Sequence, residues 1–221
     1  MKIGNMSMEA VNKLFGFMLD ASFVTLKIFA LTLLFGLPLG MIVCLLRMSK
    51  LWIIRWPIQI YLLIMRGTPL ILQLMFWEYA PFYMFKTTME RFDAAIIGFV
   101  LNYAAYFAEI FRGGIESIPA GQKEAATVLG FTRVQTFFKI ILPQVVKRVL
   151  PPMSNEFMTL IKDTSLAYVI GVAEMYQLAT KNMSSQASIV PLVMAGVFYL
   201  VINLVIQIVF NCSEKRLNYY K

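Results

Sequence analysis

Charge is scarce in this chain, and histidine is absent from it. Only 14% of the 221 residues are Asp, Glu, Lys or Arg, whereas 59% are hydrophobic, and the mean hydropathy is +0.71. A soluble domain exposes far more charge, so lipid is the expected solvent. The two cysteines, Cys44 and Cys212, have no CxxC spacing, and without histidine the chain offers no metal site and no conventional catalytic triad. We interpret both cysteines as ordinary membrane residues.

The charged residues that are present give a net charge of +8, from 20 Lys and Arg against 12 Asp and Glu. A nucleic-acid-binding protein gathers its basic residues on a soluble face beside polar residues. Here they stand between apolar runs, which is the composition of cytoplasmic loops in membrane proteins. The sequence therefore predicts a lipid bilayer around the chain and no nucleic-acid partner.

Long apolar runs divide the chain into segments that can cross a bilayer, since each crossing needs about 20 mostly apolar residues. We predict an all-α polytopic membrane protein in which residues 1–221 form one transmembrane domain. Residues 1–20 are mildly amphipathic and suit a short helix on the membrane surface. Gly36 and Gly40 form a GxxxG pattern that permits close helix packing. The expected membrane helices span about residues 21–46, 68–85, 94–111, 153–172 and 189–211.

The distribution of Lys and Arg sets the expected topology. Residues 112–150 form the longest polar stretch and are strongly basic, and the tail after residue 211 is basic as well. Because cytoplasmic loops collect Lys and Arg, both should face the cytoplasm with an even number of crossings between them. The weakly hydropathic segment 153–172 is therefore counted as a crossing. The result is five transmembrane helices, with the N-terminus outside and the C-terminus in the cytoplasm.

Four consecutive polar residues interrupt the 153–172 run, namely Lys162, Asp163, Thr164 and Ser165. An ionised side chain at the bilayer centre costs about 2.5 to 3.5 kcal/mol on insertion scales, so these residues must face protein or water. One interpretation is a structural ion pair with a neighbouring helix, or a position near the membrane interface. The other interpretation is a site on the pathway of a polar solute.

Further polar residues lie in or near the apolar runs. Gln73, Glu78 and Asn102 join the candidate substrate pathway, although Asn102, in the middle of an expected helix, is better suited to an interhelical hydrogen bond than to a ligand contact. Glu109 and Arg112 are three residues apart and are expected to pair on the last turn of the same helix.

The basic stretch 112–150 contains a spaced pattern that predicts a docking element. A short helix, a flexible joint at a glycine, a second amphipathic stretch and a proline stop follow one another. Such a helix fits a groove on a soluble partner. The pattern consists of Glu124, Ala125, Ala126, Gly130, Ile140, Leu142 and Pro143.

With this spacing the chain resembles the permease subunits of bacterial ATP-binding-cassette importers, whose shared cytoplasmic loop inserts a coupling helix into the ATPase subunit. The resemblance extends from about residue 25 to residue 216 and is to the polar amino acid branch, which includes histidine, glutamine, arginine and cystine permeases. Glu78, within Phe76-Trp77-Glu78-Tyr79, departs from the apolar aromatic run usual in that branch and is available to a substrate or to a delivery protein. The segments that carry the resemblance are Arg66-Gly67-Thr68-Pro69-Leu70, Asn102-Tyr103-Ala104-Ala105-Tyr106, Gly114-Ile115-Glu116-Ser117-Ile118-Pro119 and Lys162-Asp163-Thr164-Ser165-Leu166.

The resemblance implies an importer in the bacterial cytoplasmic (inner) membrane that moves a polar amino acid. This chain has no GxxxxGK[ST] phosphate loop, so Mg-ATP and its hydrolysis belong to separate ATPase subunits. A second permease subunit, identical or related, is expected, because five helices enclose only part of a pathway. A periplasmic or extracellular substrate-binding protein is the further implied partner.

Two other function classes were weighed. Lys162 is three residues before Ser165 and would serve as its base in an intramembrane hydrolase, but helix-interior backbone groups are already bonded and offer no oxyanion donors. A passive channel or membrane scaffold leaves the patterned cytoplasmic loop unexplained. The permease interpretation accounts for both features.

Overall fold

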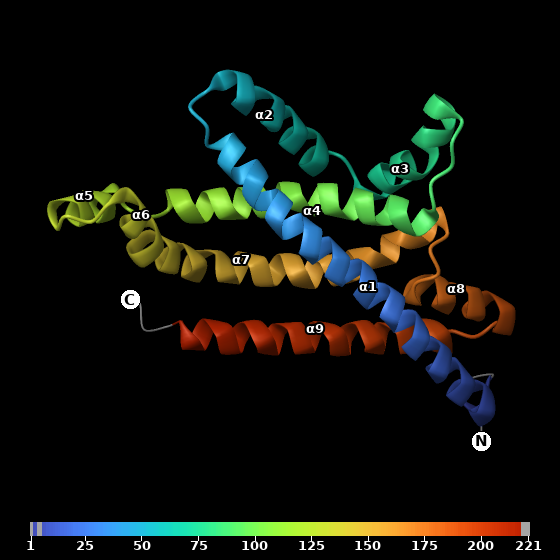
Figure 1. Cartoon of the computed structure of the whole chain (residues 1–221). Coiled ribbons are helices and arrows are strands. Elements are labelled where there is room, and N and C mark those ends of the chain that lie inside the picture. Colours follow the sequence, from blue (N-terminus) through green and yellow to red (C-terminus); the bar gives the residue numbers. More distant parts are fainter. Residues whose placement is uncertain (1, 4–5, 218–221) are drawn as a thin grey trace.

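The chain folds as a bundle of long helices, seen in a computed structural model that describes residues 2–3 and 6–217 (Figure 1). In chain order the elements are β1 (Lys2–Ile3), β2 (Met6–Ser7), α1 (Met8–Arg47), α2 (Trp52–Gly67), α3 (Leu70–Phe85), α4 (Arg91–Glu116), α5 (Ala120–Val128), α6 (Arg133–Thr136), the π-helix η1 (Phe137–Ile141), α7 (Leu142–Asp163), the 3-10 helix η2 (Thr164–Ile170), α8 (Met175–Gln186) and α9 (Val190–Arg216). The two short strands pair antiparallel ahead of α1.

The first helix is longer than the sequence suggested. α1 is continuous over 40 residues, so the separate surface helix expected within residues 1–20 is wrong. The reason lies in its apolar side, where the buried Leu14 and Met18 pack with Met175 and Ala179 of α8. Protein, rather than the membrane surface, therefore covers the amphipathic face, and the helix continues into the membrane run.

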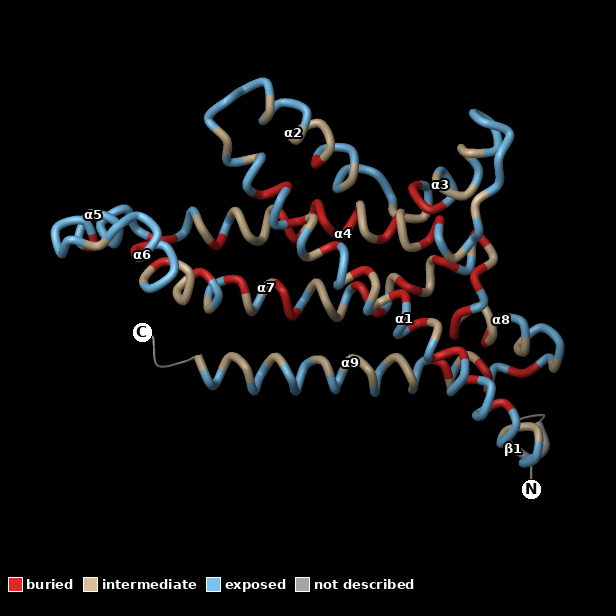
Figure 2. Tube along the Cα trace, in the orientation of Figure 1, coloured by how far each residue is buried: buried red, intermediate tan, exposed pale blue. Residues whose placement is uncertain are grey.

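α4 lies at the centre of the bundle, and α1 crosses it (Figures 1 and 2). A Cβ atom at Gly40 of α1 would lie 2.8 Å from the Cβ of Phe107 and 3.0 Å from the carbonyl oxygen of Ala104, so only glycine permits this approach. The close packing predicted from the GxxxG pattern is confirmed for α1 against α4.

Residues 52–85 form two helices joined at a sharp break. Residues 52–67, which the sequence suggested only as an aromatic approach, make α2, and the axes of α2 and α3 differ by 109°. Pro69 has no N–H to continue α2 and forces the preceding Thr68 into extended backbone, with φ −116° and ψ 147°. The expected helix 68–85 is therefore α3 alone, which begins at Leu70.

The C-terminal half also differs in detail from the expectation. The sequence predicted that Pro143 ends a helix, and this is wrong. Pro143 lies in the first turn of α7, where its missing N–H costs nothing. The expected helix 153–172 corresponds to the second half of α7 followed by η2, and α8 was not anticipated at all. Its sequence is too polar and too short to give a membrane signal.

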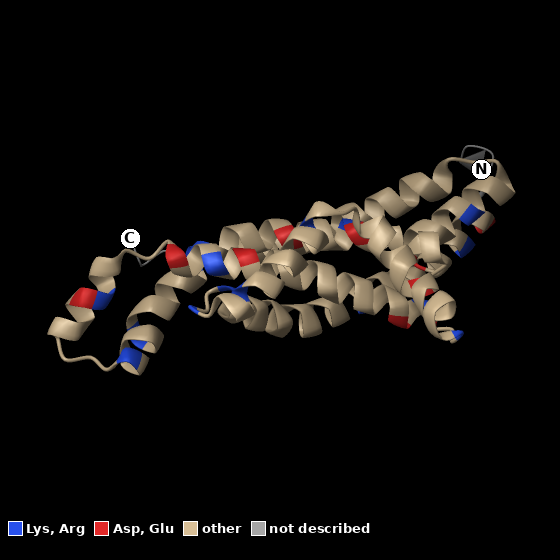
Figure 3. Ribbon diagram, turned by 90° about the horizontal axis from the view of Figure 1, so that it is seen from above, with Lys and Arg blue, Asp and Glu red and all other residues tan. Residues whose placement is uncertain are grey.

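Three helices of the described chain, α1, α4 and α9, are long and apolar enough to cross a membrane, and the bent pair α2–α3 makes up to four. The protein is therefore a multi-pass membrane protein. Charged residues lie at both ends of the bundle and also along its middle (Figure 3).

Candidate functional site

The segment made of α5, α6 and η1, residues 120–141, projects beyond the bundle between the ends of α4 and α7 (Figure 1). We call it the coupling segment. α5 contains Glu124, Ala125 and Ala126, and only Ala126 of these is buried. After α5 the chain turns at Gly130, whose φ is +77°, a conformation that glycine adopts without the penalty of a Cβ atom. The helix and joint expected from the sequence are present.

Large apolar side chains are exposed on this segment although it lies outside the apolar spans. The exposed fraction is 88% for Val128, 74% for Leu129 and 67% for Val134. Sequence reasoning missed these residues and chose Ile140, Leu142 and Pro143 instead, which are partly buried where η1 meets α7. A sequence signal was available, because apolar residues within a basic loop are candidates for a protein-interaction surface when they are exposed.

A hydrogen bond joins the two helices that flank the coupling segment. Arg148 of α7 donates a hydrogen bond to the carbonyl oxygen of Ser117, which caps the end of α4. Within the segment, Thr132 and Gln135 form a capping box in which each side chain accepts a hydrogen bond from the other residue's backbone N–H.

The break between α2 and α3 is held by two of the expected pathway residues. Asn102 of α4 donates hydrogen bonds to the carbonyl oxygen of Met65 (2.9 Å) and to Oε1 of Gln73 (3.0 Å). The Gln73 amide in turn donates to Met65 O (3.0 Å), Thr68 O (3.2 Å) and Thr68 Oγ1 (2.9 Å). Both side chains thus satisfy carbonyls left free where α2 ends, which agrees with the interhelical role considered for Asn102.

The four polar residues at the end of α7 do not converge on one point. Asp163 accepts a hydrogen bond of 2.7 Å from the Tyr103 hydroxyl of α4. Lys162 is exposed and instead lines a groove of about 620 Å³ between α7 and α9, with Asn155 and Asn203. It has no carboxylate within ion-pair distance among the described residues.

The hydroxyls of the same stretch are bonded to the backbone. Ser165 donates to the carbonyl oxygen of Lys162 (2.7 Å), and the buried Thr164 donates to the carbonyl oxygen of Ile161 (2.7 Å). A nucleophilic serine needs its hydroxyl directed at a base side chain, and here the hydroxyl is directed at a carbonyl oxygen. The geometry does not favour the Ser-Lys hydrolase.

Glu78 lies in the middle of α3 and faces Arg91 at the start of α4. One carboxylate oxygen is 3.7 Å from Nε of Arg91, while the other is buried without a hydrogen-bond partner in the described part of the chain. The Arg91 guanidinium also covers Gly171, the left-handed residue that ends η2. Glu78 therefore belongs to a contact among α3, α4 and η2, apart from the residues around Asp163.

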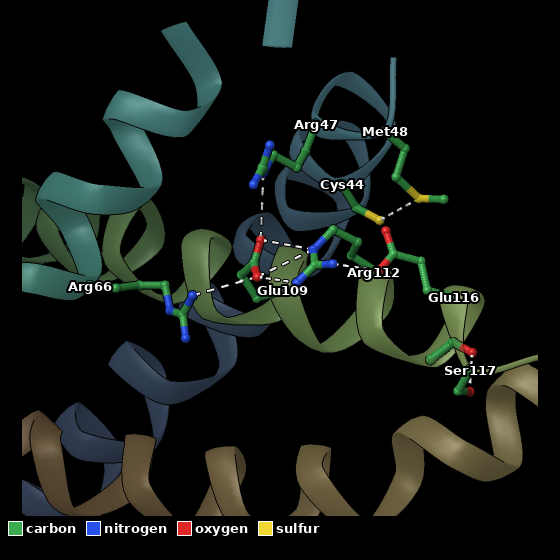
Figure 4. Close-up of polar contacts among 9 residues, drawn as sticks. Cys44, Arg47, Met48, Arg66, Glu109, Arg112, Glu116 and Ser117 are labelled. Carbon is green, nitrogen blue, oxygen red and sulfur yellow. Dashed lines mark hydrogen bonds and ion pairs between the residues drawn. The ribbon is translucent and has the colours of Figure 1, made fainter. Parts of the chain in front are cut away.

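Glu109 is the centre of a cluster of arginines (Figure 4). The pair with Arg112 that the sequence predicted is confirmed, at 2.7 Å. The same carboxylate also lies 4.0 Å from Arg47 of α1 and 3.6 Å from Arg66 of α2, and Arg112 reaches Glu116 at 2.5 Å. The pairs of Glu109 with Arg47 and Arg66 join residues that are up to 62 positions apart in sequence, so local spacing does not predict them.

A buried glutamate caps α8, outside the apolar spans. Glu174 accepts hydrogen bonds of 2.7 Å from the backbone N–H groups of Tyr176 and Gln177, and one of 3.0 Å from the Tyr199 hydroxyl of α9. Burial raises the pKa of Glu174 to about 7, although these three donors favour the charged form. The residue ties α8 to α9 and was not noted in the sequence.

Comparison with curated proteins finds transport components of similar length. The chain is 39% identical over 202 residues to the L-cystine transport system permease protein TcyB of Bacillus subtilis (strain 168), covering 90% of this chain and 85% of TcyB. It is 35% identical over 202 residues to the glutamine transport system permease protein GlnP of Escherichia coli (strain K12), covering 90% of this chain and 92% of GlnP.

Solved structures agree with this relationship. A crystal structure of an amino acid ABC transporter with histidines matches with a TM-score of 0.85 and 30% identity, covering 98% of this chain and 100% of that chain. The MetNI methionine ABC transporter, at 18% identity, shares the fold with a TM-score of 0.73 over 96% of this chain and 99% of that chain. The family model for the binding-protein-dependent transport system inner membrane component matches residues 36–219, so the chain belongs to this family of membrane transport proteins.

Proposed function

We propose that this chain is the permease subunit of an ATP-binding-cassette importer for a polar amino acid in the bacterial cytoplasmic membrane. The observation that carries the proposal is the coupling segment, with its exposed Val128, Leu129 and Val134, in a chain of the permease family. An exposed apolar surface on an element that projects beyond the bundle suits a groove of an ATPase subunit. The relatives named for cystine and glutamine transport support an amino acid as the solute.

The proposed arrangement has five crossings within one domain, with the N-terminus outside and the coupling segment in the cytoplasm. α1, α2–α3, α4 and α9 supply four of them, and α7 with η2 supplies the fifth. The fifth crossing, by α7 and η2, is inferred from charge. Residues 112–150 and the tail are both basic, which favours the cytoplasmic side for both segments and requires an even number of crossings between them. A cysteine introduced at Thr88 should react with an impermeant thiol reagent in intact cells, whereas one at Gln122 should react only after lysis.

The proposed substrate pathway runs past the α2–α3 break and the Asp163 carboxylate. A discontinuous membrane helix offers the N-terminus of its second half, here α3, to the carboxylate of an amino acid. Asp163 offers an acceptor for the ammonium group. Support comes from two consecutive residues of α4, since Asn102 bonds to Met65 and Gln73 at the break and Tyr103 bonds to Asp163.

Lys162, Thr164, Ser165 and Glu78 have weaker support as substrate contacts. Lys162 faces the groove with α9, away from Asp163, and the two hydroxyls are bonded to carbonyl oxygens. Asp163→Asn should therefore reduce uptake more than Lys162→Met when both are corrected for the amount of assembled complex. Equal uptake by Asp163→Asn and the unmodified protein would remove Asp163 from the pathway.

The proposed partners are ATPase subunits that bind Mg-ATP, a second permease subunit and a substrate-binding protein. The test is copurification with the ATPase, followed by ATP hydrolysis and uptake in proteoliposomes with the binding protein and a series of amino acids. Hydrolysis stimulated by one polar amino acid, together with its uptake, is the expected result. Uptake of the solute without any ATPase would favour the passive channel and contradict the proposal.

A further inference from the structure

The arginine cluster around Glu109 has unused hydrogen-bonding capacity. Arg112 takes the short bonds to this carboxylate, at 2.7, 3.2 and 3.3 Å. The side chains of Arg47 and Arg66 lie only at ion-pair distance from Glu109 and donate no hydrogen bond to another described residue, although the Arg66 guanidinium also lies over the Tyr106 ring, 5.6 Å from its centroid. Nε of Arg47 is buried without an acceptor, which is costly for a charged donor. The side chains of Arg47 and Arg66 are 26% and 44% exposed, so their accessible guanidinium nitrogens, rather than the buried Nε of Arg47, are open to an acceptor from outside the chain.

These two arginines border a groove of about 540 Å³ between the end of α1 and α2. Arg47, Arg66 and Gln59 make one part of its lining polar, while Leu62 and Leu63 make another part apolar, and Leu63 is exposed. The cluster has three guanidinium groups against the two carboxylates of Glu109 and Glu116, so an excess positive charge remains (Figure 4). The lining suits a ligand with an anionic head and an apolar tail.

The groove lies at the level where lipid headgroups are expected. Arg47 ends α1, and Lys50 and Arg55 follow it in the basic loop that the sequence predicts on the cytoplasmic side. Trp52 and Trp56 at the start of α2 are 65% and 57% exposed. Tryptophan is enriched at membrane–water interfaces, so these residues suit a position there. The cytoplasmic leaflet also carries the anionic lipids.

We propose that this groove binds the phosphate of an anionic phospholipid, between Arg47 and Arg66, with an acyl chain along Leu62 and Leu63. The phosphate oxygens accept hydrogen bonds from the two guanidinium groups that Glu109 leaves incompletely paired. The bound lipid thereby neutralises the cluster and links α1 to α2. This site adjoins the α2–α3 break through Arg66 and Gly67, and its test does not depend on transport.

The test is lipid binding by the assembled complex in detergent, followed by native mass spectrometry and by thermal stability during titration. Dioleoyl phosphatidylglycerol, dioleoyl phosphatidylcholine, inorganic phosphate and free glutamine are the probes. Arg47→Gln with Arg66→Gln is compared with a control, Lys50→Gln with Arg55→Gln, which removes two positive charges from the neighbouring loop. Affinity for phosphatidylglycerol should fall about fivefold for each arginine of the groove, thus about 25-fold for the pair, and less than about threefold for the control.

The unmodified complex should also prefer phosphatidylglycerol over phosphatidylcholine by at least about tenfold, a result that holds even where the double variant fails to assemble. Equal retention of the two lipids would overturn the proposal. So would stabilisation by phosphate or glutamine alone at the same concentrations, which would assign the groove to a soluble anion. If the groove no longer binds lipid once two permease subunits pair, the groove belongs to the contact with a second copy. That result would also contradict the proposal.

Discussion

α4 and the coupling segment differ in which side chains they bury and which they expose. In α4 even polar residues are buried and bonded within the chain, such as Asn102 to Gln73 and Tyr103 to Asp163. In the coupling segment, apolar residues such as Val128 and Leu129 are exposed and contact nothing that would hide them. The first region satisfies its polar groups within the chain, whereas the proposed function has another protein cover the second. Changes in α4 should therefore affect stability, and changes in the coupling segment should affect communication with the ATPase.

The largest effect is expected where α1 meets α4. Gly40→Val places atoms within 3 Å of the Phe107 Cβ and the Ala104 carbonyl, so the helices must separate. We expect a loss of roughly 3 kcal/mol or more, seen as little folded protein in size-exclusion chromatography. Gly16→Val on the same helix is the control, since nothing lies within 4 Å of that position. Equal yields of the two variants would contradict the close α1–α4 packing.

A pH-dependent effect is expected from Glu174, near the end of α9 that α8 covers. Burial raises its pKa to about 7 from 4.5, so the folded protein holds this proton more tightly than the unfolded chain. Stability is then greatest below pH 4.5 and falls as the pH rises to about 7, by on the order of 2 to 3 kcal/mol. Thermal unfolding of the purified complex between pH 5 and pH 8 measures this. Glu174→Gln should flatten the profile, while Glu90→Gln, at an exposed position, should not.

The α2–α3 break tests how much the buried polar bonds of α4 contribute. Asn102→Leu leaves Gln73 Oε1 without its donor and removes one bond to Met65 O, at a cost of about 1 to 3 kcal/mol. Asn203→Leu is the matched change in α9, where the amide bonds only to a carbonyl of its own helix, Tyr199 O. Thermal stability of both variants should separate the two sites. If Asn102→Leu lowers thermal stability less than Asn203→Leu does, the hydrogen bonds of Asn102 do not stabilise the α2–α3 break.

The smallest effect is expected at an exposed charge of the coupling segment. Glu124→Lys should weaken association with the ATPase by about 0.3 to 1 kcal/mol, the usual range for an exposed ion pair. Gln122→Lys adds a positive charge nearby without removing a carboxylate. Titration of detergent-solubilised permease with labelled ATPase measures both, and a larger effect from Gln122→Lys would show that added charge, not the lost carboxylate, is responsible.

Much of the architecture could be predicted because apolar runs and basic loops are local in sequence. The positions of α1, α4 and α9 follow from runs of about 20 apolar residues, and the coupling helix follows from its spaced pattern. The α2–α3 break was missed because Arg55, Gln59 and Arg66 lower the hydropathy of α2, although the Thr-Pro step at residues 68–69 was visible.

The candidate site was harder to predict because its partners are far apart in sequence. Tyr103 and Asp163 are 60 positions apart, and their hydrogen bond depends on how α4 packs against α7. Lys162 and Asp163 are consecutive in sequence and therefore point about 100° apart around the helix. Helical periodicity gives this angle, but it does not identify the residue that each side chain contacts. The Arg47–Glu109 contact likewise exists only after α1 crosses α4.

The central claim, that the coupling segment links this permease to an ATPase, is tested most directly at Gly130. Its φ of +77° and its open surroundings mean that Gly130→Val strains the joint behind α5 without any steric clash. The measurement is ATP hydrolysis and amino acid uptake by the same proteoliposomes, with Gly113→Val, at an open position in α4, as the control. We predict normal membrane insertion with stimulated hydrolysis and uptake reduced on the order of tenfold for Gly130→Val. Hydrolysis and uptake equal to those of the unmodified protein would contradict the account.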